Sequence, residues 1–167
     1  MQNWRGNRTR VRLALLCTAA FCFGTGIFTG IERGIARPPL FVPDPIAGYA
    51  IGGHDPVSYF VDNRPRQGSR KFSYKWGGAE WVFVNQGNLA AFKKNPEIYA
   101  PLFAACGAYA LTNGFATSGN PFIFAIVGRK LIFFHSEVNR FLFLVNDRQL
   151  LAEAEANAQK TGCVPNR

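Results

Sequence analysis

Two pairs of apolar segments, each divided by a glycine turn, set the pattern of this chain. Aromatic residues occupy every second position of residues 71–76, and this period predicts a half-buried strand. Gly77-Gly78 then turns the chain into the apolar run 81–84, so we expect a hairpin. A second hairpin is predicted around Gly128, between the apolar runs 122–127 and 131–134, which are typical of central strands.

Each predicted hairpin is followed by apolar residues at helical spacing. Asn85 is the predicted cap of a helix with Leu89 and Phe92 in the core, and Asn95-Pro96 ends it. Ser136 opens a second helix, for which we expect four core residues at helical spacing, Val138, Phe141, Leu142 and Val145. A last amphipathic helix extends from Asp147 to Lys160. No internal repeat is evident in the sequence.

These elements predict an α+β fold, with a mostly antiparallel sheet of two hairpins and helices packed on one side of it, after an N-terminal apolar helix. The apolar helix is expected in Leu13 to Ile31, which carry no charge and follow an arginine-rich start. We therefore expect export to the periplasm or another extracytoplasmic space. The segment is either a cleaved signal peptide or a single transmembrane anchor in the inner membrane.

The predicted organisation has four parts. Residues 1–36 form the signal peptide or anchor, and the proline-rich residues 37–47 form an extended tether. Residues 48–161 form the domain, and residues 162–167 form a C-terminal tail. The bilayer is an expected partner through residues 13–31.

Composition narrows the class of protein. Apolar residues make up 48% of the 167 residues and charged residues 17%, which is typical of a compact domain and not of a disordered chain or a polytopic membrane protein. The net charge is +9, and five basic residues lie between Asp62 and Glu80. We interpret them as a solvated loop and strand edge. Contact with anionic lipid is an alternative, and nucleic acid is not an expected partner because no nucleic-acid motif accompanies them.

Candidate chemistry is concentrated in residues 48–60. The Gly52-Gly53 pair predicts a sharp turn from which His54 and Asp55 project, and Asp55 suits the cap of a short helix with Pro56 at its first position. We therefore expect His54 and Asp55 to line the most ligand-like concavity. With Tyr59, Cys106 and His135 they form the candidate ligand set for copper, zinc or iron.

Two motifs resemble the extracytoplasmic branch of the YHS domain family. They are GYAIGGHDPVSYF at residues 48–60 and FSYKWGGAEWVFVNQGNLAAFKKNPEIYAP at residues 72–101. The metal-binding members of this family hold a metal through cysteines that this chain lacks. Here the corresponding positions hold Ser58, Val84 and a residue near Asn88. The cysteine expected after Tyr-Ala-Pro falls at Gly107, one position after Cys106.

Cysteine usage gives a further prediction. Cys106 and Cys163 are the only cysteines after the apolar segment, and an exported domain permits oxidation, so we expect a disulfide between them. The alternative keeps Cys106 as a buried thiol or metal ligand and leaves Cys163 in a frayed tail.

The sequence thus supports two functions. One is an exported binding domain for a transition metal or small ligand. The other is a non-catalytic accessory subunit that docks to a membrane protein complex. We do not expect an enzyme, because a Cys106 nucleophile with His54 as its base matches no local catalytic signature.

Overall fold

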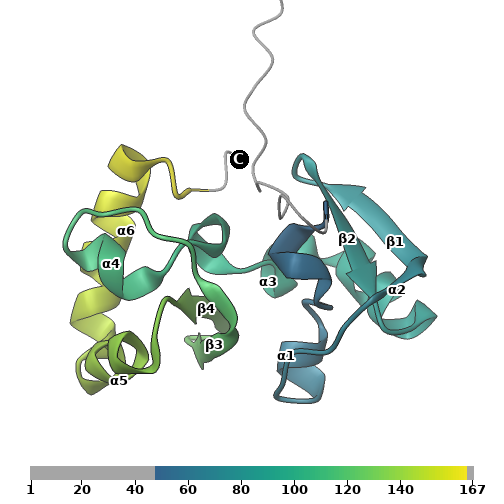
Figure 1. Cartoon of the computed structure of the whole chain (residues 1–167), viewed down its shortest axis with the longest axis horizontal. Helices are drawn as coiled ribbons and strands as arrows, with labels where there is room; N and C mark the ends of the chain where they lie inside the picture. The colour runs from purple at the N-terminus through teal and green to yellow at the C-terminus, as the bar shows by residue number, and fades with distance from the viewer. Residues whose placement is uncertain (1–47, 165–167) are drawn as a thin grey trace, which may run out of the picture. The chain divides into compact units, whose positions relative to one another are not determined.

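The computed structural model describes residues 48–164, so the predicted apolar segment 13–31 and the tether 37–47 lie outside the described residues. Figure 1 shows the arrangement of the elements. They are η1 (Ala50–Gly53), α1 (Ser58–Val61), β1 (Ser69–Trp76), β2 (Ala79–Phe83), α2 (Gln86–Lys94), α3 (Pro96–Tyr99), η2 (Leu102–Ala105), α4 (Ala108–Thr112), β3 (Asn120–Val127), β4 (Lys130–Phe134), α5 (Glu137–Val145) and α6 (Asp147–Thr161). No helix in residues 48–164 has the length and apolar character needed to span a membrane.

Both predicted hairpins are present, but they do not join in one sheet. β1 pairs with β2 and β3 with β4, each antiparallel, in two separate two-stranded sheets (Figure 1). The expectation of a single sheet was therefore wrong. One reason is a β-bridge that β4 forms outside its hairpin, between Phe133 and Gly107 in the loop before α4. This bridge occupies hydrogen-bonding positions that a strand of the other hairpin would need.

The domain contains an internal structural repeat, which was not evident in the sequence. Both halves have a left-handed turn, a short helix, a hairpin with a bulge and a nine-residue helix, in that order. An offset of 51 residues relates Gly68 to Gly119, Asn85 to Ser136 and Asn95 to Asn146. We call residues 50–95 the first repeat and residues 102–146 the second repeat.

The backbone hydrogen bonds of the two repeats match. Gly68 N–H donates to the carbonyl of Gly53 at 2.9 Å, and Gly119 N–H donates to the carbonyl of Ala105 at 2.9 Å. Both positions require glycine for steric reasons. An added Cβ would lie 2.5 Å from an atom of Val82 at Gly68, and 2.5 Å from an atom of Phe133 at Gly119. Each repeat thus closes its turn onto its hairpin in the same way.

The turns themselves are left-handed in both repeats. In the first, φ is 47° at Ile51, 63° at Gly52 and 77° at Gly53. In the second, Phe103, Ala104 and Ala105 have φ of 62°, 52° and 69° without any glycine. Left-handed angles cost about 1–2 kcal/mol for each non-glycine residue, so the second turn depends on stabilising contacts around it.

Two hydrophobic cores meet at β4. Leu131 and Phe133 belong to the first core, with Tyr59, Trp81, Phe83 and Phe92, whereas Ile132 and Phe134 belong to the second core. The second core also contains Phe103, Leu111, Phe143, Ala154, Ala158 and Cys163. β4 is therefore buried on both faces. The expectation that both apolar runs form central strands was wrong, because their sheet has only two strands and β3 leaves Phe122 and Ile126 exposed.

α2 and α5 begin at their predicted caps. Asn85 accepts a hydrogen bond from the N–H of Asn88, and Ser136 accepts one from the N–H of Asn139. α2 buries Leu89 and Phe92 as expected. α6 ends at Gly162 with φ of 73°, and the chain beyond it stays in the domain, because Cys163 is buried and Val164 packs against the second core.

α5 differs from the prediction in its buried side. Of its residues only Phe143 is fully buried, whereas Val138, Phe141, Leu142 and Val145 are exposed. The expectation that these four residues face the core was wrong. Phe143 takes the core position because it is the counterpart of Phe92, and the four residues lie on other sides of the helix.

Candidate functional site

Asp55 is the centre of a buried polar cluster in the first repeat. It is fully buried, and its carboxylate accepts hydrogen bonds from Val57 N–H at 2.8 Å, from Val84 N–H at 2.9 Å and from Asn88 Nδ2 at 2.6 Å. The carboxylate therefore points into the domain and fixes the turn to the end of β2 and the start of α2. The expectation that the Asp55 side chain lines an accessible concavity was wrong.

Ser58 completes this cluster. Its hydroxyl lies 2.7 Å from the carbonyl oxygen of Asp55 and 3.0 Å from that of Arg64, and it accepts a hydrogen bond from Arg66 N–H at 3.2 Å. Ser58 and Val84 stand at positions where the resemblance would place cysteine ligands, and the third such position lies near Asn88. Ser58, Val84 and Asn88 converge on Asp55, but they meet it through hydrogen bonds. These residues offer no thiolate, so the donor set does not fit the metal of the YHS relatives.

Tyr59 connects the first repeat to the second. Its ring packs edge-on against Phe124 with centroids 4.8 Å apart, and its hydroxyl donates to the carbonyl of Pro121 at 3.0 Å. Burial raises the pKa of Tyr59 well above its ordinary value, and the Asp55 carboxylate adds to the shift. The phenol is therefore a neutral structural donor and not an accessible ligand.

The two histidines lie in different repeats. His54 is half-buried, with Nδ1 3.0 Å from the carbonyl oxygen of Ile51 and its ring edge-on to Phe122 at 4.9 Å. His135 is exposed, with Nδ1 3.3 Å from the carbonyl oxygen of Ser118. Within residues 48–164, no three His, Cys, Asp or Glu side chains form a group that could hold a metal ion.

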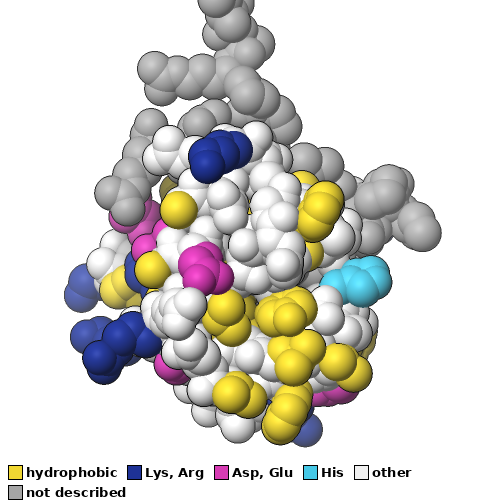
Figure 2. Space-filling view, turned by 90° about the vertical axis from the view of Figure 1, so that its left-hand side faces the viewer, with side chains coloured by type: hydrophobic (Ala, Val, Ile, Leu, Met, Phe, Trp, Pro, Cys, Tyr) yellow, Lys and Arg dark blue, Asp and Glu magenta, His cyan; other side chains and the backbone are white. Residues whose placement is uncertain are grey.

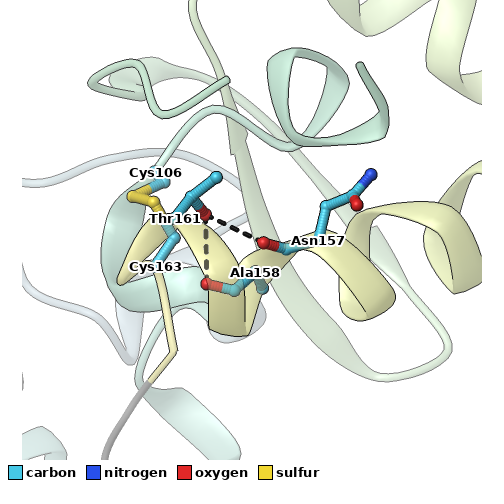
Figure 3. Close-up of a disulfide and its surroundings, with 5 residues drawn as sticks. All are labelled: Cys106, Asn157, Ala158, Thr161 and Cys163. Atoms are coloured by element: carbon cyan, nitrogen blue, oxygen red, sulfur yellow. Dashed lines mark hydrogen bonds between the residues drawn. A yellow bond between two sulfur atoms is a disulfide. The ribbon is translucent and has the colours of Figure 1, made fainter. Parts of the chain in front are cut away.

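Cys106 is joined to Cys163 in the predicted disulfide, with Cα atoms 6.0 Å apart (Figure 3). The bond ties the residue after the strained turn of the second repeat to the end of α6. Thr161 turns its hydroxyl back onto the carbonyls of Asn157 and Ala158, at 3.1 and 3.0 Å, which closes the last turn of α6 beside the disulfide. In this state Cys106 offers neither a thiolate ligand nor a nucleophile.

The second repeat has no counterpart of the Asp55 cluster. Gly107 takes the place of Asp55, and a Cβ there would lie 2.9 Å from Thr117 Oγ1. Cys106 takes the place of His54, since both are bridge residues directly after the left-handed turn. His54 and Cys106 are thus equivalent positions of the two repeats, and the fold keeps these two candidate ligands in separate turns. Their positions beside glycines in the sequence therefore did not indicate a shared site.

The most unusual surface is the exposed side of α5, which we call the α5 face. It consists of apolar side chains with these exposed fractions: Val138 65%, Phe141 68%, Leu142 40%, Leu144 44% and Val145 71%. Figure 2, which looks at the side of the domain that carries α5, shows apolar side chains gathered in its lower part. Contiguous exposed apolar surface of this kind marks interaction sites in soluble domains.

α2 provides an internal comparison for the α5 face. The two helices have equivalent positions in the repeats, and both bury a phenylalanine, Phe92 or Phe143. At the positions of Val138, Phe141, Leu144 and Val145, however, α2 carries Gly87, Ala90, Lys93 and Lys94. The fold therefore accepts small or charged residues here, so folding does not require the apolar side chains of α5.

A signal for this face was present in the sequence. Six of the nine residues of α5 are strongly apolar, and they surround the helix, whereas a helix packed on one side can bury only one stripe. The excess over one stripe indicates a second contact surface.

Comparisons with protein-family models, with curated proteins and with solved structures found no match to this chain.

Proposed function

We propose that this chain is an exported, non-catalytic accessory domain that docks to a membrane protein complex through the α5 face. The observation that carries the proposal is the exposure of five apolar side chains on a helix whose counterpart in the same domain has only glycine, alanine or lysine at these positions. Val138, Phe141, Leu142 and Val145 have the spacing by which an amphipathic helix enters an apolar groove. The partner is thus expected to present a groove with an apolar floor.

The alternative of a transition-metal or small-ligand domain has less support. The carboxylate of Asp55 already accepts three hydrogen bonds, and the sulfur of Cys106 is bonded to Cys163. The same disulfide removes the nucleophile from a Cys106 and His54 catalytic mechanism. Membership of the extracytoplasmic YHS branch stays a proposal that rests on the motifs at residues 48–60 and 72–101.

An exchange of residues between the repeats tests the docking proposal. The exchange variant carries Phe141→Ala, Leu144→Lys and Val145→Lys, which copy Ala90, Lys93 and Lys94 of α2. In gently solubilised membranes from cells that make the full-length chain, we expect the original chain to migrate in a complex much larger than its own mass. The exchange variant should migrate as the free chain.

The matched control replaces exposed apolar residues elsewhere, Val61→Ser and Phe115→Ser, and should leave the complex intact. If the control dissociates the complex as fully as the exchange variant does, the α5 face is not the specific contact. A purified chain that is a stable dimer, and that the exchange variant converts to a monomer, would show that the face binds a second copy instead.

A further inference from the structure

The first repeat carries a basic surface around the edge strand β1, which we call the basic face. Its members are all exposed: Arg64, Arg66, Arg70, Lys71, Lys75, Lys93 and Lys94. Within the described residues, only Arg66 of these seven has an ion-pair partner, Asp62 at 3.3 Å. Glu80 lies opposite Lys75 in the hairpin register, and Glu97 follows α2. The surface therefore keeps a clear excess of positive charge.

Three of these basic side chains form cation–π contacts with aromatic rings. The Arg70 guanidinium lies 5.9 Å from the centre of the Tyr49 ring, and the Lys93 ammonium lies 5.0 Å from that of Tyr74. Lys71 lies 5.5 Å from the ring centre of Phe72. Such contacts are attractive for a cation over a ring face, so these long side chains have preferred positions on the domain.

The second repeat shows that the fold does not require this charge. The offset of 51 residues places no charged residue at any equivalent position: they hold Phe115, Thr117, Pro121, Phe122, Ile126, Leu144 and Val145. The same scaffold thus has a basic surface in one repeat and mainly apolar residues in the other. A purely structural role for seven basic residues is therefore a poor explanation.

The basic face includes a contact close to the predicted membrane tether. Tyr49, which stacks with Arg70, is only two residues beyond the predicted tether, which ends at residue 47. The chain between the predicted apolar segment and Gly48 has sixteen residues, and an extended chain of that length reaches about 50 Å. A domain held on this tether stays at high local concentration near the bilayer surface.

We propose that the basic face binds the anionic phospholipid headgroups of the membrane from which the domain is tethered. The inference shares with the proposed function only the placement of the domain at a membrane. Lys and Arg near an anionic bilayer each contribute to binding, and the attraction weakens as salt rises. The first repeat then holds the domain against the lipid, while the α5 face of the second repeat is used for the protein partner.

Vesicle flotation tests this inference. The fragment 37–167 is suitable because both cores and the disulfide lie within residues 50–164, and a thermal melt checks that it folds. We expect it to float with vesicles of phosphatidylcholine and phosphatidylglycerol, and not with phosphatidylcholine alone. Lys71→Gln with Lys93→Gln should weaken binding about 25-fold, roughly fivefold for each residue. Raised salt should weaken the binding of the original fragment.

Two variants serve as controls. Arg129→Gln with Lys130→Gln removes the same charge from the turn of the second repeat and should leave vesicle binding unchanged. Phe141→Ala should also leave it unchanged, so a failure of α5 docking does not mimic a failure of lipid binding. The inference is overturned if phosphatidylcholine alone binds equally well, if the Arg129 and Lys130 variant loses as much affinity, or if duplex nucleic acid binds more tightly than the anionic vesicles.

Discussion

At the scale of single residues, the domain uses its candidate chemistry for structure. Asp55 satisfies the backbone at the start of α1 and at the end of β2, and Asn88 adds a donor from α2. The sequence predicted a sharp turn and a helix start in residues 48–60, because glycine, aspartate and proline have strong local preferences. It could not predict that Asp55 faces inward, because two of its three partners, Val84 and Asn88, lie about thirty residues away in sequence.

Asp55→Asn is expected to lower the free energy of unfolding by about 3 kcal/mol. The amide loses the charge that strengthens these hydrogen bonds, and its NH2 group faces donors at Val84 or Asn88. Chemical denaturation measures the loss. Asp62→Asn, on the surface, should change stability by less than about 1 kcal/mol. Equal stability of Asp55→Asn and the original chain would show that the cluster does not hold the turn.

Tyr59 should make the domain less stable in alkali. Its folded-state pKa is raised above the unfolded value near 10, so its contribution is complete below pH 10 and is lost as pH rises through the folded pKa. Tyr59→Phe loses the hydrogen bond to Pro121, about 1 kcal/mol at neutral pH. The stability difference between the two chains should therefore shrink and then reverse above pH 10. A constant difference across that range would contradict the assignment.

At the scale of elements, the sequence predicted both hairpins, all three longer helices and the caps of α2 and α5. It did not reveal the repeat, because backbone geometry is shared at positions whose side chains differ, such as Asp55 and Gly107 or Lys93 and Leu144. It also assigned the wrong side of α5 to the core. Apolar spacing identifies a helix, but it does not say which apolar stripe is covered when there are two.

The exchange variant should fold as well as the original chain. Phe141→Ala, Leu144→Lys and Val145→Lys alter exposed side chains that α2 lacks at equivalent positions, so we expect a change in unfolding free energy within about 0.5 kcal/mol. Phe143→Ala, which empties a core position, should cost about 4 kcal/mol. A large loss from the exchange variant would mean that the α5 face contributes to folding and not only to docking.

At the scale of the whole molecule, the two repeats share β4 as a common core strand and differ in their surfaces. The proposals of export and tethering rest on the segment 13–31, which lies outside the described residues. The Cys106–Cys163 bond is the long-range constraint that secures the end of α6 to the strained turn of the second repeat.

Loss of this bond should have a large effect. Cys163→Ser opens a loop that spans a sequence separation of 57 residues, and the loop-entropy estimate predicts a loss of about 4 kcal/mol in unfolding free energy. Thermal unfolding with and without reductant measures it, and reductant should then have no effect on the variant. If the original chain unfolds at the same temperature in both conditions, the bond does not stabilise the fold.

The central claim is that the α5 face contacts a protein and the equivalent face of α2 does not. A photo-crosslinking amino acid can replace Phe141 or Ala90 in the full-length chain, in the cells that produce it. We predict a discrete crosslinked product of one size from position 141 and none from position 90, and the product should disappear when Leu144→Lys and Val145→Lys are added. No product from position 141, or the same product from both positions, would contradict the claim.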